Sequence, residues 1–213
     1  MRATLVAGCL AAAVTATGCL VKETTHTIHL SPDGTVSWTV IERAVRSDEP
    51  DGERRHREED EYLTAARLGR HPVAAAFGLL APAGIQTTIH RDRRPFLVLT
   101  EARFDRLDWL AGRLLDRLKL SGTSTLERVN DGWRWTLKVD KEAEAEESDE
   151  AGLLSALAED VSAYCVVLES GRFIDAVGFE LSGDGAAARP VDLEDRPADG
   201  PFVLSLTWTG TAR

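Results

Sequence analysis

Hydrophobic and polar residues alternate along three stretches of the chain, and each stretch has a turn sequence near its middle. In the first, residues 25–45, the alternation flanks the turn sequence SPDG at 31–34, which is typical of two half-buried strands joined by a tight turn. The alternation slips by one residue after Val40, which predicts a β-bulge there. The stretches 85–104 and 123–140 have their turns at 91–95 and at NDG, 130–132. The pattern therefore predicts three β-hairpins.

Other stretches have the spacing of helices. Residues 106–120, RLDWLAGRLLDRLKL, carry leucines three or four residues apart, which predicts an amphipathic helix with one apolar stripe. The stripe consists of Leu107, Leu110, Leu114, Leu115 and Leu118. We expect it to pack against the sheet, with Leu114 near the centre of the contact. A charged helix is predicted over residues 53–68 and shorter helices over residues 72–80 and 150–159.

The order of these elements predicts the fold class. Three hairpins are separated by helices, and the segment 163–187 and the final stretch PFVLSLTWTG add further strands. We therefore expect an α+β domain with a mainly antiparallel sheet built from hairpins and amphipathic helices packed on one face. The pair of strands around Ser170 and Gly171 is expected to form a further hairpin.

The first 19 residues have the pattern of an export signal. Arg2 supplies a positive charge, and residues 3–17 are apolar or small with no further charge. This run is too short to cross a bilayer core comfortably, but it is typical of a secretory signal peptide. The sequence Ala16-Thr17-Gly18-Cys19 resembles the lipobox of bacterial lipoproteins. The resemblance implies that Cys19 receives a lipid and becomes the first residue of the mature protein.

Two alternatives remain for this segment. An ordinary signal peptide cleaved near the same place leaves Cys19 as a plain thiol. A second box at residues 6–9, ending in Cys9, fits the lipobox consensus better, but too few residues precede it to form a signal. We therefore predict a signal peptide over 1–18, a lipidated cysteine and short tether over 19–24, and a single α+β domain over 25–213. The layout of anchor, PDG-type turn and helices on one sheet is similar to LppM-type lipoprotein domains, which implies a fold and no catalytic residue.

The charge of the chain narrows the classes of partner, and its cysteine content limits the disulfides that can form. Without Arg2, the mature chain has 24 basic and 35 acidic residues, a net charge of −11. Such a charge argues against binding to nucleic acid and against broad electrostatic adhesion to anionic lipid. Only Cys165 remains in the mature domain, so no intramolecular disulfide forms. Its apolar neighbours predict a small buried hydrophobic residue.

A search for catalytic motifs finds none. The chain lacks the nucleophile-elbow, zinc-protease, P-loop and dinucleotide-binding patterns. His26 and His29 are three residues apart on a strand and so point to opposite faces. The carboxylates at 58–61 are expected to pair with arginines one turn away on the same helix. We therefore predict a protein that is not an enzyme and that uses no metal and no cofactor.

Two groups of residues are candidates for binding. Arg91, Arg93 and Arg94 form the one basic cluster of an acidic chain and could contact lipid headgroups or an anionic partner. The alternative is a polar hairpin tip that discourages edge pairing. Of the five tryptophans, Trp109 is the one expected to be exposed, because it lies beside the leucine stripe.

The sequence thus favours a lipid-anchored protein of the cell envelope with a non-catalytic structural or partner-binding role. The anchor is expected to hold it on the periplasmic or extracellular face of a membrane. Leu20 after the anchor cysteine is compatible with the outer membrane, by analogy with enteric lipoproteins. The alternative is a binding module that holds an apolar or amphipathic ligand between its sheet and its helices. We expect the partner to be an envelope protein or such a ligand.

Overall fold

The computed structural model describes residues 20–140, 154, 157, 164–191 and 201–210, and it confirms the α+β class. Seven strands form one sheet in the order β3-β4-β2-β1-β7-β10-β9, and four form a second sheet in the order β5-β6-β11-β8. The strands of the first sheet are β1 (Leu20–Leu30), β2 (Val36–Ser47), β3 (Gly84–Arg91), β4 (Phe96–Phe104), β7 (Tyr164–Leu168), β9 (Phe179–Leu181) and β10 (Ala187–Pro190). Those of the second are β5 (Gly122–Val129), β6 (Gly132–Val139), β8 (Arg172–Val177) and β11 (Phe202–Thr209).

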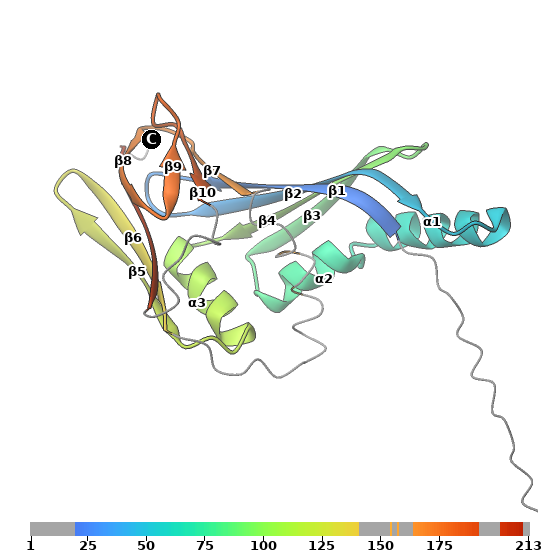
Figure 1. Cartoon of the computed structure of the whole chain (residues 1–213), viewed down its shortest axis with the longest axis horizontal. Helices are drawn as coiled ribbons and strands as arrows, with labels where there is room; N and C mark the ends of the chain where they lie inside the picture. The colour runs from blue at the N-terminus through green and yellow to red at the C-terminus, as the bar shows by residue number, and fades with distance from the viewer. Residues whose placement is uncertain (1–19, 141–153, 155–156, 158–163, 192–200, 211–213) are drawn as a thin grey trace, which may run out of the picture.

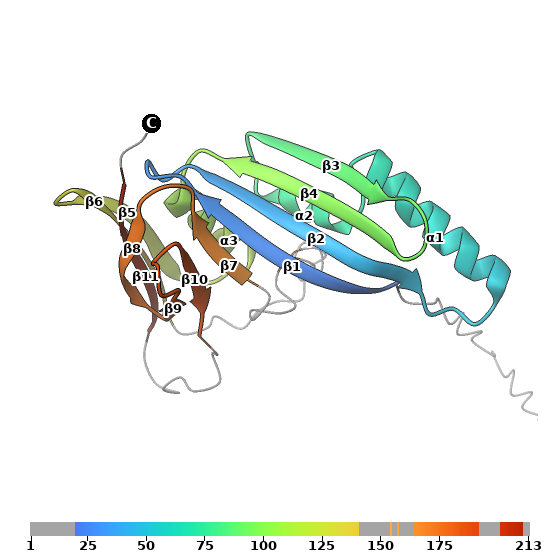
Figure 2. The same ribbon diagram turned by 90° about the horizontal axis from the view of Figure 1, so that it is seen from above.

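The described helices lie on one face of the seven-stranded sheet, as the sequence predicts (Figure 1). They are α1 (Gly52–Arg67), α2 (Pro72–Leu79) and α3 (Leu107–Arg117). The four-stranded sheet stands across one end of the first sheet, next to α3 (Figure 1). Seen from above, α1 runs beneath the tip of the β3–β4 hairpin, at the opposite end from the second sheet (Figure 2).

One hydrophobic core joins the two sheets. Trp38 of β2, Phe77 of α2, Leu110 of α3 and Trp208 of β11 are all buried in the same cluster. The Trp208 indole also donates a hydrogen bond of 3.2 Å to the carbonyl of Pro32, in the first hairpin turn. A second, smaller cluster lies between α1 and strands β2 and β4. Its buried members are Val45, Tyr62, Leu63, Ala66, Phe96 and Val98.

The turn of the first hairpin fixes the position of the second sheet. Gly34 has a φ of 92°, a conformation in which glycine is favoured. A Cβ at this position would also lie 2.5 Å from Cδ2 of Leu126 on β5. The backbone N–H of Leu107 donates to the Gly34 carbonyl at 3.0 Å, so the start of α3 is tied to the same turn.

The structure corrects several details of the sequence prediction. The bulge lies between Arg43 and Val45 rather than after Val40, and Ala44 adopts a φ of 52° there. The strands on either side of Gly171 do not form a hairpin, because β7 pairs in parallel with β1 while β8 pairs with β11 in the other sheet. Residues 20–24, expected as a tether, form the first part of β1 and pair with β2. Of the helix predicted over 150–159, the structure describes only Leu154 and Leu157, both helical and buried.

Two burial predictions also need correction. Leu114 is half-buried at the edge of the core, whereas Leu107, Leu110 and Leu115 are buried. Most of the buried residues of α3 lie in its first half, so the centre of the contact lies nearer the start of the helix than Leu114. Cys165 is half-buried on β7, opposite Thr27, rather than enclosed in the core.

Candidate functional site

The three arginines of the predicted basic cluster have different environments at the β3–β4 hairpin tip. All three are exposed, Arg94 with 41% of its side chain, but only Arg94 has a described side-chain contact. Arg94 donates from Nε to a carboxylate oxygen of Glu59, and its Nη2 lies 3.1 Å from Nδ1 of His56. Because Glu59 is buried and Arg94 is its charged partner, Arg94 has a structural role in fastening the tip to α1.

Glu58 and Glu59 of α1 contact β2 and the hairpin tip rather than arginines of the same helix. Glu59 also accepts a hydrogen bond of 3.1 Å from the backbone N–H of Ser47, and the Ser47 hydroxyl donates to Glu58. Asp51 caps the helix by accepting from the N–H groups of Glu53 and Arg54. These contacts hold the first half of α1 against the end of β2.

A buried ionic cluster lies deeper between the sheet and α1 and α2. Lys22 of β1 contacts Glu42 of β2 at 2.6 Å, and the Tyr62 hydroxyl of α1 donates to the same carboxylate at 2.8 Å. His71, at the start of α2, lies 3.5 Å from this carboxylate and 2.9 Å from the hydroxyl of Thr100 on β4. The cluster therefore connects three strands to two helices.

Burial shifts the pKa values of two members of this cluster. Burial, reinforced by the neighbouring Glu42 carboxylate, raises the pKa of Tyr62 above its ordinary value, so the phenol stays a donor. Burial lowers the pKa of His71, which favours the neutral ring despite the opposing effect of Glu42. Glu42 and His71 are almost completely buried, so substrates in solution cannot reach them. We interpret the cluster as a structural device that orients α1 and α2 on the sheet.

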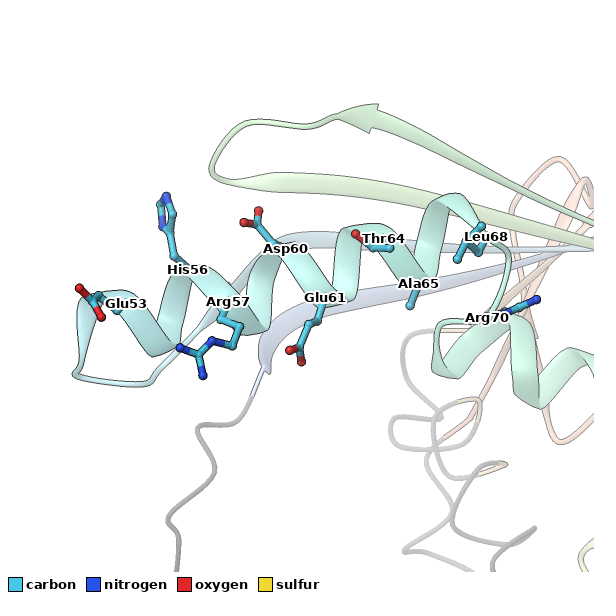
Figure 3. Close-up of a pocket in the computed structure, with 9 residues that line it drawn as sticks. All are labelled: Glu53, His56, Arg57, Asp60, Glu61, Thr64, Ala65, Leu68 and Arg70. Carbon is cyan, nitrogen blue, oxygen red and sulfur yellow. The ribbon is translucent and has the colours of Figure 1, made fainter.

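A surface hollow of about 630 Å³ follows the outward side of α1 (Figure 3). The side chains along it carry both signs of charge, and nearly all are exposed. They are Glu53, His56, Arg57, Asp60, Glu61, Thr64, Ala65, Leu68 and Arg70. The close-up shows them on the solvent side of the helix, with the strands behind (Figure 3). This is the solvated face of an amphipathic helix, and it does not enclose a ligand.

A hollow of about 450 Å³ on the exposed side of α3 has a more specific composition. Trp109 is 53% exposed there, and the Arg113 guanidinium stacks over its ring, 4.4 Å from the centroid. Asp116, Arg117 and Lys119 complete the hollow with Gly112. Tryptophan and arginine are the residues most enriched among those that dominate binding energy at protein interfaces. The local charge is also positive, with three basic residues and one acidic residue, in a chain of net charge −10.

Two residues of this hollow are less favourable for the stability of the protein than other residues would be at the same positions. Gly112 lies inside α3, where glycine is about 1 kcal/mol less favourable than alanine. A Cβ added at Gly112 would meet no atom within 4 Å, so packing does not require the glycine. Lys119 follows the helix with a φ of 57°, a conformation that glycine adopts more readily. The unfavourable glycine leaves space beside Trp109, and the unfavourable lysine adds a charge to the rim.

The structure therefore separates the predicted binding residues into two places. The arginine tip lies at the α1 end of the first sheet, whereas Trp109 lies on α3 near the second sheet (Figures 1 and 2). The exposure of Trp109 is as predicted. Sequence reasoning missed Gly112 and Arg113, although a glycine inside a leucine-striped helix and an arginine four residues after a tryptophan were visible signals. Cys19 lies outside the described residues.

Metal binding and membrane crossing are two further possible roles for the described residues. No group of three histidine, cysteine, aspartate or glutamate side chains in the described parts of the chain is placed to hold a metal ion. Among the same residues, no helix has the length and apolar character needed to cross a membrane.

Comparison with known proteins gives one structural neighbour to report. The NMR structure of the folded domain of the Mycobacterium tuberculosis LppM protein matches with a TM-score of 0.35 and 11% sequence identity, over 89% of this chain and 90% of that chain. No protein-family model and no curated protein matches the sequence.

Proposed function

We propose that this protein is a lipid-anchored component of the cell envelope that binds a protein partner through the exposed side of α3 and has no catalytic role. The anchor is the diacylated Cys19 implied by the export signal and lipobox-like sequence. The observation that carries the binding role is the half-exposed Trp109 with Arg113 stacked over it. We call this surface, with Gly112, Asp116, Arg117 and Lys119, the Trp109 surface.

The chemistry of the Trp109 surface defines the partner. The indole offers a large apolar contact, and the guanidinium stacked over it places a positive charge beside that contact. Three basic side chains surround an aromatic centre. The surface therefore fits a protein segment that presents a carboxylate beside an apolar side chain, and the charge pairing contributes specificity and a faster association rate.

The alternative hypothesis, an apolar ligand held between sheet and helices, receives less support. The described side chains between these layers are packed together, with Trp38, Phe77 and Leu80 buried against one another in the core. Where the first sheet meets α1, polar contacts around Glu42 occupy the interface instead. A ligand of any size would have to displace these side chains.

If the Trp109 surface binds a partner, a photo-crosslinking amino acid placed within it should form a covalent adduct with that partner in intact cells. A photo-crosslinking amino acid in place of Asp116 is expected to yield one discrete adduct. The same probe in place of Glu127, an exposed position on β5, is expected to yield none. Trp109→Ala should abolish the adduct at position 116, because truncating such an anchor residue typically weakens binding by 2 kcal/mol or more, about 30-fold.

Gly112→Ala and Lys119→Gly give a sharper comparison, because both are expected to make the protein more stable while weakening binding. Gly112→Ala should raise the free energy of unfolding by about 1 kcal/mol and fill the space beside the indole. Urea unfolding measures the stability, and adduct yield measures the binding. An adduct that is equally abundant at positions 116 and 127, or that survives Trp109→Ala, contradicts the proposed surface.

A further inference from the structure

Strand β3 forms one edge of the seven-stranded sheet, and its neighbour among the described strands is β4. Its sequence from Gly84 to His90 is GIQTTIH, which contains no lysine, arginine, aspartate, glutamate or proline. An edge strand carries a row of backbone N–H and C=O groups that can pair with another strand. Natural proteins usually block such edges with charge, proline, bulges or short strands.

The other described edges of the two sheets have these protections. Strand β9 at the far edge of the first sheet has only three residues and includes Glu180. Strand β8 contains Arg172 and Asp175, and its pairing with β11 has a register shift. Strand β5 contains Glu127 and Arg128 and packs against α3. Strand β3 also contacts α1 and α2 and ends in Arg91, after a register shift in its pairing with β4. Its residues from Gly84 to His90 nevertheless present an edge without acidic or basic side chains of the Asp, Glu, Lys or Arg type and without proline.

The sequence of β3 is also suited to pairing with itself. In an antiparallel pair centred on Thr87, Ile85 lies opposite Ile89 of the second copy, and Gln86 lies opposite Thr88. Isologous pairing of this kind is the usual way in which two identical chains associate. Like residues then face each other across the pair, and no two charges are opposed. Cross-strand pairs of β-branched side chains are among those that stabilise a sheet.

The monomer leaves apolar surface exposed along this edge. Ile85 is 40% exposed, and the register above would cover it with Ile89 of the second copy. Leu68, 61% exposed, follows the last residue of α1. The corner between α1 and α2 lies beneath the middle of β3, because His71 contacts Thr100, which is the cross-strand partner of Thr87. A strand added to β3 would therefore extend over this corner.

We propose that two copies of this protein associate through β3, antiparallel and centred on Thr87, so that their seven-stranded sheets become one continuous sheet. The Trp109 surface lies on α3, away from this edge, and remains available in the dimer (Figure 2). The dimer does not depend on the proposed partner or on the lipid at Cys19.

The test uses the full-length protein in its native membrane. Thr87→Cys places two sulfhydryls across the two-fold axis, at a Cα separation of about 4.5–5.5 Å, which is within the range of a disulfide. Mild oxidation is expected to give a covalent homodimer far above the background of the unsubstituted chain. Gln86→Cys is the matched control, because its two copies are offset by two residues along the strands and lie about 8 Å apart, too far to bridge. Equal cross-linking of the two variants contradicts the register.

A second pair of variants tests the same edge without a new cysteine. Ile85→Lys places a charge toward Ile89 of the other copy, and we expect it to reduce the dimer by tenfold or more, since burying an unpaired charge is strongly unfavourable. Val203→Lys makes the same kind of change at a strand position that is 36% exposed in the second sheet, and it should leave the dimer intact. Sedimentation equilibrium in density-matched detergent measures both. A monomeric unsubstituted protein, or an unchanged Ile85→Lys dimer, overturns the proposal.

Discussion

Replacing Glu42 by alanine is expected to lower the free energy of unfolding by about 3–5 kcal/mol. The carboxylate accepts from Tyr62, pairs with Lys22 and is almost completely buried. Its removal leaves an ammonium group that is largely shielded and a phenol without an acceptor, and both groups were desolvated on folding. Urea unfolding of the full-length protein, followed by tryptophan fluorescence, measures the loss.

The cause of that loss can be separated from the size of the side chain. The triple variant Lys22→Met, Glu42→Leu and Tyr62→Phe removes the ion pair and the phenol hydroxyl at similar volume and leaves His71 in contact with Thr100. Apolar replacements of buried ion pairs are often neutral or stabilising. It should therefore be much more stable than Glu42→Ala. If the triple variant is as unstable as the single one, the ionic contacts are not the reason for the loss.

The second large effect is expected at α3. Leu110→Ala should lower the free energy of unfolding by about 2–5 kcal/mol, through lost transfer energy and an unfilled cavity. Leu110 is buried in the cluster that joins the two sheets, together with Trp38 and Trp208. The loss should appear as a lower midpoint of urea unfolding with an unchanged slope.

Leu114→Ala is the control for this prediction. Leu114 is half-buried at the margin of the same cluster, so its truncation removes less contact and leaves a space that solvent can fill. We expect a smaller loss than at Leu110. The opposite order would show that the core contact of α3 is centred on Leu114 rather than on Leu110.

The local parts of this fold could be predicted from the sequence. The alternation around the SPDG turn and the leucine spacing of α3 predicted elements whose bounds agree with the structure to within a few residues. These patterns report short-range geometry, in which strand and helix periods differ clearly. The same patterns contain no information about which strands pair at long range. The split of β7 and β8 into separate sheets therefore could not be predicted. The turn residues Ser170 and Gly171 suggested an ordinary hairpin instead.

The candidate sites show a similar division. An exposed Trp109 followed from its place beside the leucine stripe, which is a local property. The pairing of Arg94 with Glu59 joins residues 35 positions apart, and it gives a predicted binding residue a structural contact that the sequence did not indicate. The cluster around Glu42 was missed for the same reason: its members lie on five elements, and no local pattern distinguishes a buried glutamate in a strand from an exposed one.

The central claim is that the protein is held in the envelope by a lipid on Cys19, and metabolic labelling with a fatty acid tests it most directly. The unsubstituted chain should incorporate the label and lose the mass of residues 1–18. Cys19→Ala should abolish both labelling and processing, whereas Cys9→Ala should retain both, because too few residues precede Cys9 to form a signal. Labelling that survives Cys19→Ala and disappears in Cys9→Ala, or an unsubstituted chain that takes up no label, would contradict the account.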